Sequence, residues 1–328
     1  MKKVAILGCG FMGGTHAGVY EALSDRVQVV AVADVRREKA EELAAKFGAK
    51  VYGEAMELLE NASADYIDIC LPTYLHCRYA VAALKKGFHV FVEKPLCLTR
   101  EETDLLLKTQ KETGRLAQVG QVIRFWDEYV YLKGIKDSGI YGKVIGGRFS
   151  RLSSRPTWAW DGWLHDAERS GGMALDFHIH DADFIRYLMG DPQQVRSSVS
   201  YEAGKAAEYI MTDYVYGNTL LTAEGCWDFP ADFPFSATYW VKFEKATVVY
   251  NEKGVTVYEQ GGKAFTPEMK TQFNGENTAD GNIASLGGYY NEIKYFLSRL
   301  DDPTLPDIAS LEEGAASLSM VLREIEGA

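Results

Sequence analysis

The sequence predicts an α/β fold class, in which a doubly wound parallel sheet is followed by an α+β domain with a large, mostly antiparallel open sheet. Its 328 residues exceed one typical hydrophobic core and indicate about two domains. In the first part short apolar runs alternate with helical patterns, which is typical of a parallel sheet. Beyond about residue 140 long alternating runs joined by Gly/Asn turns indicate antiparallel pairing. We expect the domains to span residues 1–122 and 123–328.

Each crossover of the first domain is predicted to be a right-handed βαβ unit. Helices are expected to begin at about residues 15, 37 and 76, and a fourth helix over 100–114 is expected to end at Gly114 as its C-cap. The expected strands are 3–7, 27–34, 66–71, 89–94 and 116–122.

The second domain is predicted from period-two runs and two closing helices. The helices are expected over about 287–300 and 308–326. The expected strands are 142–155, 194–203, 208–217, 219–229, 235–251 and 254–260.

Composition excludes several classes of partner. Acidic residues outnumber basic ones by 46 to 35 and no Lys/Arg run occurs, so we expect neither a nucleic-acid nor a membrane partner. Five cysteines without C-x-x-C spacing argue against disulfides or a zinc site. The first apolar run is too short for a signal peptide and no stretch approaches a membrane span, so a soluble, cytoplasmic protein is expected.

The segment "GCGFMG" predicts a dinucleotide-binding Rossmann turn. Gly8, Gly10 and Gly13, which enclose Phe11 and Met12, have G-x-G-x-x-G spacing between a strand and a helix. The glycines allow the tight turn, the approach of a pyrophosphate to the backbone and the packing of helix on strand. The helix N-terminus offers free N–H groups to the phosphates.

Asp34 lies about 20 residues further on, at the end of the second strand. Its carboxylate suits the ribose hydroxyls of NAD and would repel the extra phosphate of NADP. Arg36 or Arg37 could instead bind that phosphate, so NADP or dual use is the alternative to NAD.

Four segments, "GCGFMGGTH", "LPTYLH", "VEKPL" and "SGGMALDFHIHDADF", together resemble the Gfo/Idh/MocA family of oxidoreductases. The resemblance covers essentially the whole chain. It implies a Rossmann domain and a C-terminal domain whose open sheet mediates homodimer or homotetramer formation. It also implies a cofactor pocket that contains Glu93 and Lys94 and is lined by Leu71, Pro72, Thr73 and His76; an N-cap role for Thr73 is an equal alternative.

In that family the lysine of E-K-P lies beside the nicotinamide and the substrate hydroxyl, which implies a catalytic role for Lys94, oriented by Glu93. An ammonium in a closed pocket has a lowered pKa and can shuttle a proton. The resemblance likewise implies that Asp176 and His180 are catalytic and bind substrate. His180 would accept the hydroxyl proton.

Helical spacing places Asp176, His180 and Asp183 on one face, whereas His178 falls on the apolar stripe. We interpret His178 as a hydrogen-bonded core or pocket-lining residue. No metal site is expected here, because the nicotinamide already accepts electrons and no further ligand cluster is evident.

A substrate wall is predicted from the aromatic segment "RPTWAWDGWLHD". The family resemblance implies that Arg124 in "VGQVIRF" also binds substrate. The rings of Trp158, Trp160 and Trp163 could stack on sugar or cyclitol C–H faces, or could instead pack at an interface.

The sequence therefore favours an NAD(P)-dependent dehydrogenase that oxidises a secondary hydroxyl of a cyclic polyol or sugar, or catalyses the reverse. The alternatives are a glycoside-cleaving enzyme that uses transient oxidation, and a catalytically silent cofactor-sensing regulator.

Overall fold

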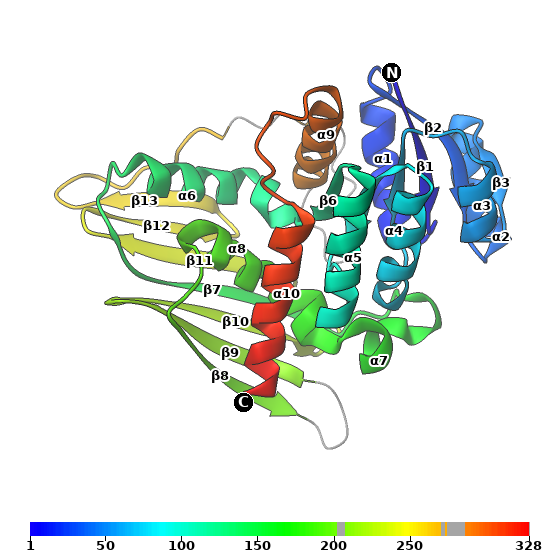
Figure 1. Ribbon diagram of the computed structural model, residues 1–328. Helices are drawn as coiled ribbons and strands as arrows, with labels where there is room; N and C mark the ends of the chain where they lie inside the picture. The colour runs from blue at the N-terminus through cyan, green and yellow to red at the C-terminus, as the bar shows by residue number, and fades with distance from the viewer. Residues whose placement is uncertain (202–206, 270–272, 274–285, 328) are drawn as a thin grey trace.

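Two β-sheets lie side by side in the computed structural model, each with its own helices (Figure 1). The structure describes residues 1–201, 207–269, 273 and 286–327. Among these residues, no helix is long and apolar enough to cross a membrane.

The first sheet has six parallel strands in the order β3-β2-β1-β4-β5-β6, which is the doubly wound Rossmann order. Its central strands are buried over most of their length, as expected when helices cover both faces. The strands are β1 (Lys2–Leu7), β2 (Val27–Ala33), β3 (Lys50–Tyr52), β4 (Tyr66–Ile69), β5 (His89–Glu93) and β6 (Ala117–Gly120). The helices are α1 (Phe11–Ala22), α2 (Arg37–Phe47), α3 (Ala55–Asn61), α4 (His76–Lys85) and α5 (Arg100–Thr113).

The second sheet has seven strands in the order β13-β12-β11-β7-β10-β9-β8, and every pair except β7 with β10 is antiparallel. The predicted fold class is therefore confirmed. The strands are β7 (Val144–Ser154), β8 (Gln194–Tyr201), β9 (Ala207–Tyr216), β10 (Thr219–Phe229), β11 (Ser236–Phe243), β12 (Ala246–Asn251) and β13 (Gly254–Glu259). The helices of this half are α6 (Asp127–Ser138), α7 (Ala167–Ser170), α8 (Ile179–Met189), α9 (Gly287–Asp301) and α10 (Leu311–Glu326).

Several element boundaries differ from the sequence expectation. Strand β3 and helix α3 were not expected, because each is too short to give a clear period. Helix α1 begins at Phe11 rather than near residue 15, so the third glycine lies inside its first turn. The run 235–251 is a hairpin of two strands, and the end of the expected strand 194–203 lies outside the described residues.

Helix α10 connects the two halves of the molecule. It packs against α8 and β8 of the second half and against α5 and β6 of the first (Figure 1). Its N-cap Ser310 accepts a hydrogen bond from the backbone N–H of Glu313, which satisfies one of the free donors of the first turn. The last helix of the chain therefore fixes the helix that carries the candidate catalytic residues relative to the nucleotide domain.

Candidate active site

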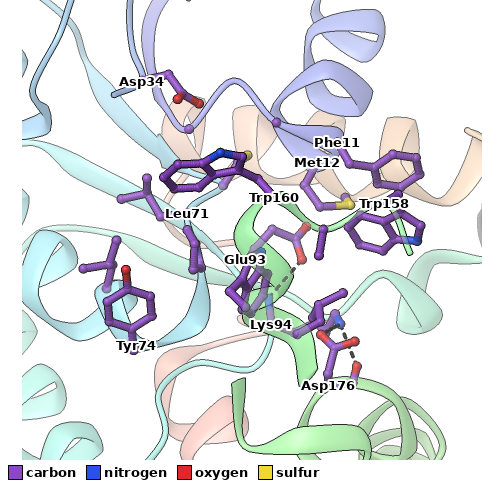
Figure 2. Close-up of a pocket in the computed structure, with 18 of the residues that line it drawn as sticks. Phe11, Met12, Asp34, Leu71, Tyr74, Glu93, Lys94, Trp158, Trp160 and Asp176 are labelled. Atoms are coloured by element: carbon purple, nitrogen blue, oxygen red, sulfur yellow. Dashed lines mark hydrogen bonds and ion pairs between the residues drawn. The ribbon is translucent and has the colours of Figure 1, made fainter. Parts of the chain in front are cut away.

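A cavity lies between the two sheets, and side chains from both domains line it (Figure 2). Counting its open mouth, its empty volume is about 1790 Å³. Fifteen of the residues singled out from the sequence line it: Gly8, Gly10, Phe11, Met12, Asp34, Arg36, Leu71, Pro72, Glu93, Lys94, Trp158, Trp160, Trp163, Asp176 and His180.

The glycine turn is as tight as the motif predicts. Gly8 has φ of +93°, and a Cβ on it would lie 2.5 Å from the carbonyl oxygen of Cys70. A Cβ on Gly13 would lie 2.0 Å from the carbonyl oxygen of Gly8, so a larger residue at position 13 would clash with the turn. Gly10 is the N-cap of α1, and the first helical turn contains no acidic side chain. Its backbone N–H groups therefore suit a pyrophosphate, and the donor set of the turn fits NAD.

Asp34 lies at the end of β2 beside this turn and accepts hydrogen bonds on both carboxylate oxygens. Oδ2 accepts from the backbone N–H of Cys9 at 2.8 Å and from the Arg36 guanidinium at 3.2 Å. Oδ1 accepts from the backbone N–H and from Nε of Arg36, at 2.8 and 3.2 Å. Arg36 is therefore held by the carboxylate, which favours NAD because an arginine so engaged is not free to bind a 2′-phosphate.

We expect Asp34→Ser to raise the preference for NADP over NAD at least tenfold, because the substitution removes the repelling carboxylate and releases Arg36. The dissociation constants of both nucleotides, measured by calorimetry, give the ratio. The double variant Asp34→Ser/Arg36→Ala is the control and should lose most of the gain. An unchanged ratio in Asp34→Ser would show that Asp34 does not determine the choice.

Lys94 directly follows β5 and lies at the other end of the cavity. Its Nζ donates to Oδ1 of Asp176 at 2.9 Å and to the backbone carbonyl of Asp176 at 2.7 Å (Figure 2). Both side chains are about one-sixth exposed, so the pair faces the cavity while it remains partly shielded from water. Glu93 accepts a hydrogen bond from the backbone N–H of Lys94 at 3.1 Å. The lysine is thus held at both its backbone and its ammonium group.

A turn of π-helix, Ala174–His178, directly precedes α8. Such turns are rare and often occur at functional sites, because they change which side chains face a given direction. Here Asp176 and His180 both line the cavity, as the predicted four-residue spacing requires. Burial, followed by the nearby charges of Lys94 and Arg151, places the pKa of His180 well below its usual value. The imidazole is therefore neutral near pH 7 and can accept a proton.

Behind Glu93 lies a buried polar network that the sequence analysis did not identify. The ring of His16 contacts Asp68 at 2.9 Å and Glu93 at 3.1 Å, and Tyr20 donates to Asp68 at 2.8 Å. Burial lowers the pKa of His16, but the charges and hydrogen bonds of Asp68 and Cys70 outweigh burial, so the pKa lies well above the usual value. Three potential metal-ligand atoms, contributed by His16, Glu93 and Glu292, also lie within 4.8 Å of one another. Only the tertiary structure joins these groups, since they come from α1, β4, β5 and α9.

Four predicted site residues lie outside the cavity lining. Gly13 supports the glycine turn. Thr73 is buried in a short 3₁₀ turn whose N-cap is Pro72, so the alternative that Thr73 is an N-cap is wrong. His76 is buried, and its ring hydrogen-bonds to the carbonyls of Pro95 at 2.8 Å and Leu71 at 2.7 Å. His76 therefore ties two cavity-lining loops together from behind.

Arg124 was expected to bind substrate, and the structure corrects this. Its fully buried guanidinium donates to both oxygens of Asp183 at 2.8 and 2.7 Å, to Glu313 at 3.0 Å and to the carbonyl of Ile308. The carboxylate of Asp183 therefore faces Arg124, and does not line the cavity as Asp176 does. Arg124 connects the domain junction to α8 and α10.

His178 lies in the core. Its Nε2 contacts Glu324 of α10 at 2.8 Å, and the same carboxylate accepts hydrogen bonds from Thr212 at 2.9 Å and Tyr214 at 2.8 Å. All four side chains are fully buried or nearly so. The interpretation of His178 as a hydrogen-bonded core residue agrees with this arrangement.

The three tryptophans of the 155–166 loop lie in different parts of the cavity. Trp158 stacks on Phe11, with ring centroids 4.6 Å apart, whereas Trp160 lies beside Arg36 (Figure 2). Sequence reasoning also missed Arg151, a cavity-lining arginine within a strand that pairs with buried Asp181 at 2.7 Å. The alternating pattern of β7 does not indicate that Arg151 is buried and faces the cavity. The other lining residues that were missed include Glu54, Tyr74, Trp126, Phe177, Phe235 and Tyr289.

Family models match both halves of the chain. Residues 2–121 match the model described as "Oxidoreductase family, NAD-binding Rossmann fold", and residues 129–255 match the "GFO/IDH/MocA C-terminal domain". The chain belongs to the GFO/IDH/MocA family. The resemblance inferred from the motifs is confirmed, and the nucleotide-binding half is an NAD-binding Rossmann domain.

Similar proteins in this family include two inositol dehydrogenases. The scyllo-inositol 2-dehydrogenase (NAD(+)) of Bacillus subtilis is 34% identical over 57% of this chain and 54% of its own length. The myo-inositol 2-dehydrogenase of Thermotoga maritima is 30% identical over 63% of this chain and 62% of its own. The chain thus matches little more than half the length of these relatives. A crystal structure of an Agrobacterium radiobacter oxidoreductase with NAD+, L-tartaric acid and magnesium shares the fold, with a TM-score of 0.86 at 17% identity, covering 100% of this chain and 96% of that one.

Proposed function

We propose that this member of the GFO/IDH/MocA family is an NAD-dependent dehydrogenase that oxidises a secondary hydroxyl of a cyclic polyol or sugar to a ketone, or catalyses the reverse. One observation carries the proposal. Lys94, Asp176 and His180 converge at one end of a cavity whose other end holds the glycine turn and Asp34. A proton-transfer group and a dinucleotide site therefore open onto the same space.

His180 is the proposed general base. Its neutral imidazole can take the hydroxyl proton, and such proton transfer contributes roughly 10²–10⁴ to a rate. Bound NAD would supply the acceptor for the hydride from the same carbon.

Lys94 and Asp176 are proposed to hold the reacting hydroxyl. The ammonium of Lys94 stabilises negative charge that develops on the substrate oxygen, and its bond to Asp176 fixes its direction. The cations Lys94 and Arg151 also keep His180 unprotonated, which is the state a base requires.

The substrate class is inferred from aromatic side chains and from the named relatives. Trp158 and Trp163 line the cavity, and indole faces suit the C–H faces of a sugar or cyclitol. The relatives from Bacillus subtilis and Thermotoga maritima are inositol dehydrogenases, which supports a cyclic polyol as substrate.

We also propose that copies of this chain form a homodimer or homotetramer through the second sheet. One face of this sheet carries α8 and α10 (Figure 1). Large apolar side chains are exposed along its strands. These side chains are Ile145, Leu220, Trp240 and Tyr258.

We expect Lys94→Ala to reduce turnover at least a hundredfold while the dissociation constant of NAD changes little, because the ammonium group acts on the substrate oxygen. Steady-state kinetics and calorimetry with NAD measure the two effects. Lys85→Ala, on the last turn of α4, is the control and should behave like the unaltered protein. Unchanged turnover in Lys94→Ala would remove Lys94 from the mechanism.

The function itself is tested by mixing the purified protein with NAD or NADP and a panel of inositols, aldoses, deoxy sugars and sugar acids. We expect the absorbance of the reduced nicotinamide to appear with one compound class. If no compound gives a signal although NAD binds, the glycoside-cleaving or sensing alternative replaces the dehydrogenase.

A further inference from the structure

The 155–166 loop comes from the second domain but reaches the nucleotide end of the cavity. The guanidinium carbon of Arg36 lies 5.1 Å from the centroid of the Trp160 ring, and Arg36 is itself held by Asp34. Figure 2 shows this indole between Asp34 and Glu93, away from the Lys94–Asp176 pair. The ring therefore lies beside the carboxylate that the ribose of a dinucleotide would approach, and not beside the candidate base.

The backbone that carries Trp160 is held in an unusual shape. Asp161 has φ of +55° and Gly162 has φ of +59°, and a left-handed aspartate costs energy that surrounding contacts must offset. Arg169 provides such a contact, because it donates to the Asp161 carboxylate at 3.0 Å and lies 5.3 Å over the ring of Tyr74, which also lines the cavity. Arg169 thus links Asp161, the residue next to Trp160, to Tyr74 of the nucleotide domain.

Trp158 and Trp160 differ in what they leave free. Trp158 already stacks on Phe11, at 28° between the ring planes, whereas Trp160 contacts a guanidinium. The two side chains are similarly exposed, Trp158 by 40% and Trp160 by 47%. An exposed indole next to an arginine is the combination that binds a flat heteroaromatic base, because such a base can stack on both.

We propose that Trp160 is a cofactor-binding residue that holds the adenine ring between its indole and the guanidinium of Arg36. From the sequence, Trp160 was expected in a substrate wall or at an interface. Two stacked contacts at about 3.5 Å each need a separation of about 7 Å. The present 5.1 Å therefore has to open by about 2 Å when adenine enters. The second domain would in this way contribute to nucleotide affinity whichever hydroxyl compound the protein oxidises.

Binding of nucleotide fragments to the whole protein tests this inference without any substrate. ADP-ribose carries the adenine, and nicotinamide mononucleotide carries the other end of NAD. We expect Trp160→Ala to weaken ADP-ribose at least tenfold in calorimetry and to change nicotinamide mononucleotide less than twofold. Trp160→Phe, which keeps a stacking ring, should recover most of the ADP-ribose affinity. Phe265→Ala is the control, because it removes an aromatic side chain that is 40% exposed and lies outside the cavity lining, and it should change ADP-ribose less than threefold.

A fluorescence measurement gives a second readout. Stacking of adenine on Trp160 should quench tryptophan emission when ADP-ribose is added, and Trp160→Phe should lose that quenching. Unchanged ADP-ribose affinity in Trp160→Ala would overturn the inference. A loss confined to nicotinamide mononucleotide would overturn it as well, because it would place Trp160 at the nicotinamide end. Neither result would bear on the proposed dehydrogenase, since the panel of hydroxyl compounds tests that activity separately.

Discussion

His180→Asn is expected to lower turnover by about 10²–10⁴ and to leave the dissociation constant of NAD nearly unchanged. Asparagine is close to imidazole in size and polarity but cannot accept the proton. The effect should appear in turnover rather than in the Michaelis constant, since proton transfer takes place in the transition state. Stopped-flow recording of reduced nicotinamide, with the substrate found in the panel, measures it.

The pH dependence gives an independent check of the same residue. Because the pKa of His180 is lowered, mainly by burial, the base stays neutral below the usual histidine value of about 6.5. The rate of oxidation should therefore fall, through protonation of His180, only at a pH clearly below 6.5. The free energy of unfolding should also decrease as the pH falls below about 6.5, because the unfolded chain then binds a proton at His180 that the folded chain does not bind. A turnover limb close to pH 6.5 that disappears in His180→Asn would contradict the lowered pKa.

Arg124→Ala is expected to reduce the free energy of unfolding by about 3–5 kcal/mol. The substitution leaves the carboxylate of Asp183 buried without the partner that holds both of its oxygens. Glu313 and the carbonyl of Ile308 lose a donor as well, so the contact between the domain junction and α10 weakens. Urea unfolding followed by circular dichroism measures the change.

Two further variants test whether the destabilisation comes from burial of the ion pair or from the loss of any one charge. Arg37→Ala removes a surface pair with Glu41, in which the arginine side chain is 78% exposed, and should cost less than about 0.5 kcal/mol. The double variant Arg124→Met/Asp183→Leu removes both charges and should recover part of the loss. If Arg124→Ala were no more destabilising than Arg37→Ala, the buried pair would not stabilise the junction.

Much of the candidate site could be predicted from local pattern. The spacing of Gly8, Gly10 and Gly13 reflects steric contacts within one turn, and Asp34 follows at the distance set by one helix and one strand. Asp176 and His180 also reach the cavity together, since one helical turn separates them. The alternation along β7 to β13 likewise predicted the second sheet, because its period depends on the strand alone.

Other features of the site depend on contacts between segments that are distant in the sequence. A sequence pattern could not show that Arg124 points at Asp183, because the partner lies 59 residues away. For the same reason His178 could be placed on an apolar stripe, while its partner Glu324 on the last helix could not be named. The network around His16 draws on four separate elements and left no local signal.

The sequence by itself determined the two-sheet architecture, the dinucleotide turn and the family, because each rests on short-range geometry or on contiguous motifs. Only the tertiary structure decided which polar groups are buried, which are paired and which face the cavity. It separated Trp160 from Trp158, placed Arg124 in the domain junction and lowered the pKa of His180 through burial near Lys94 and Arg151. These properties follow from desolvation and from distances between charges, and both arise only when segments distant in the chain pack together.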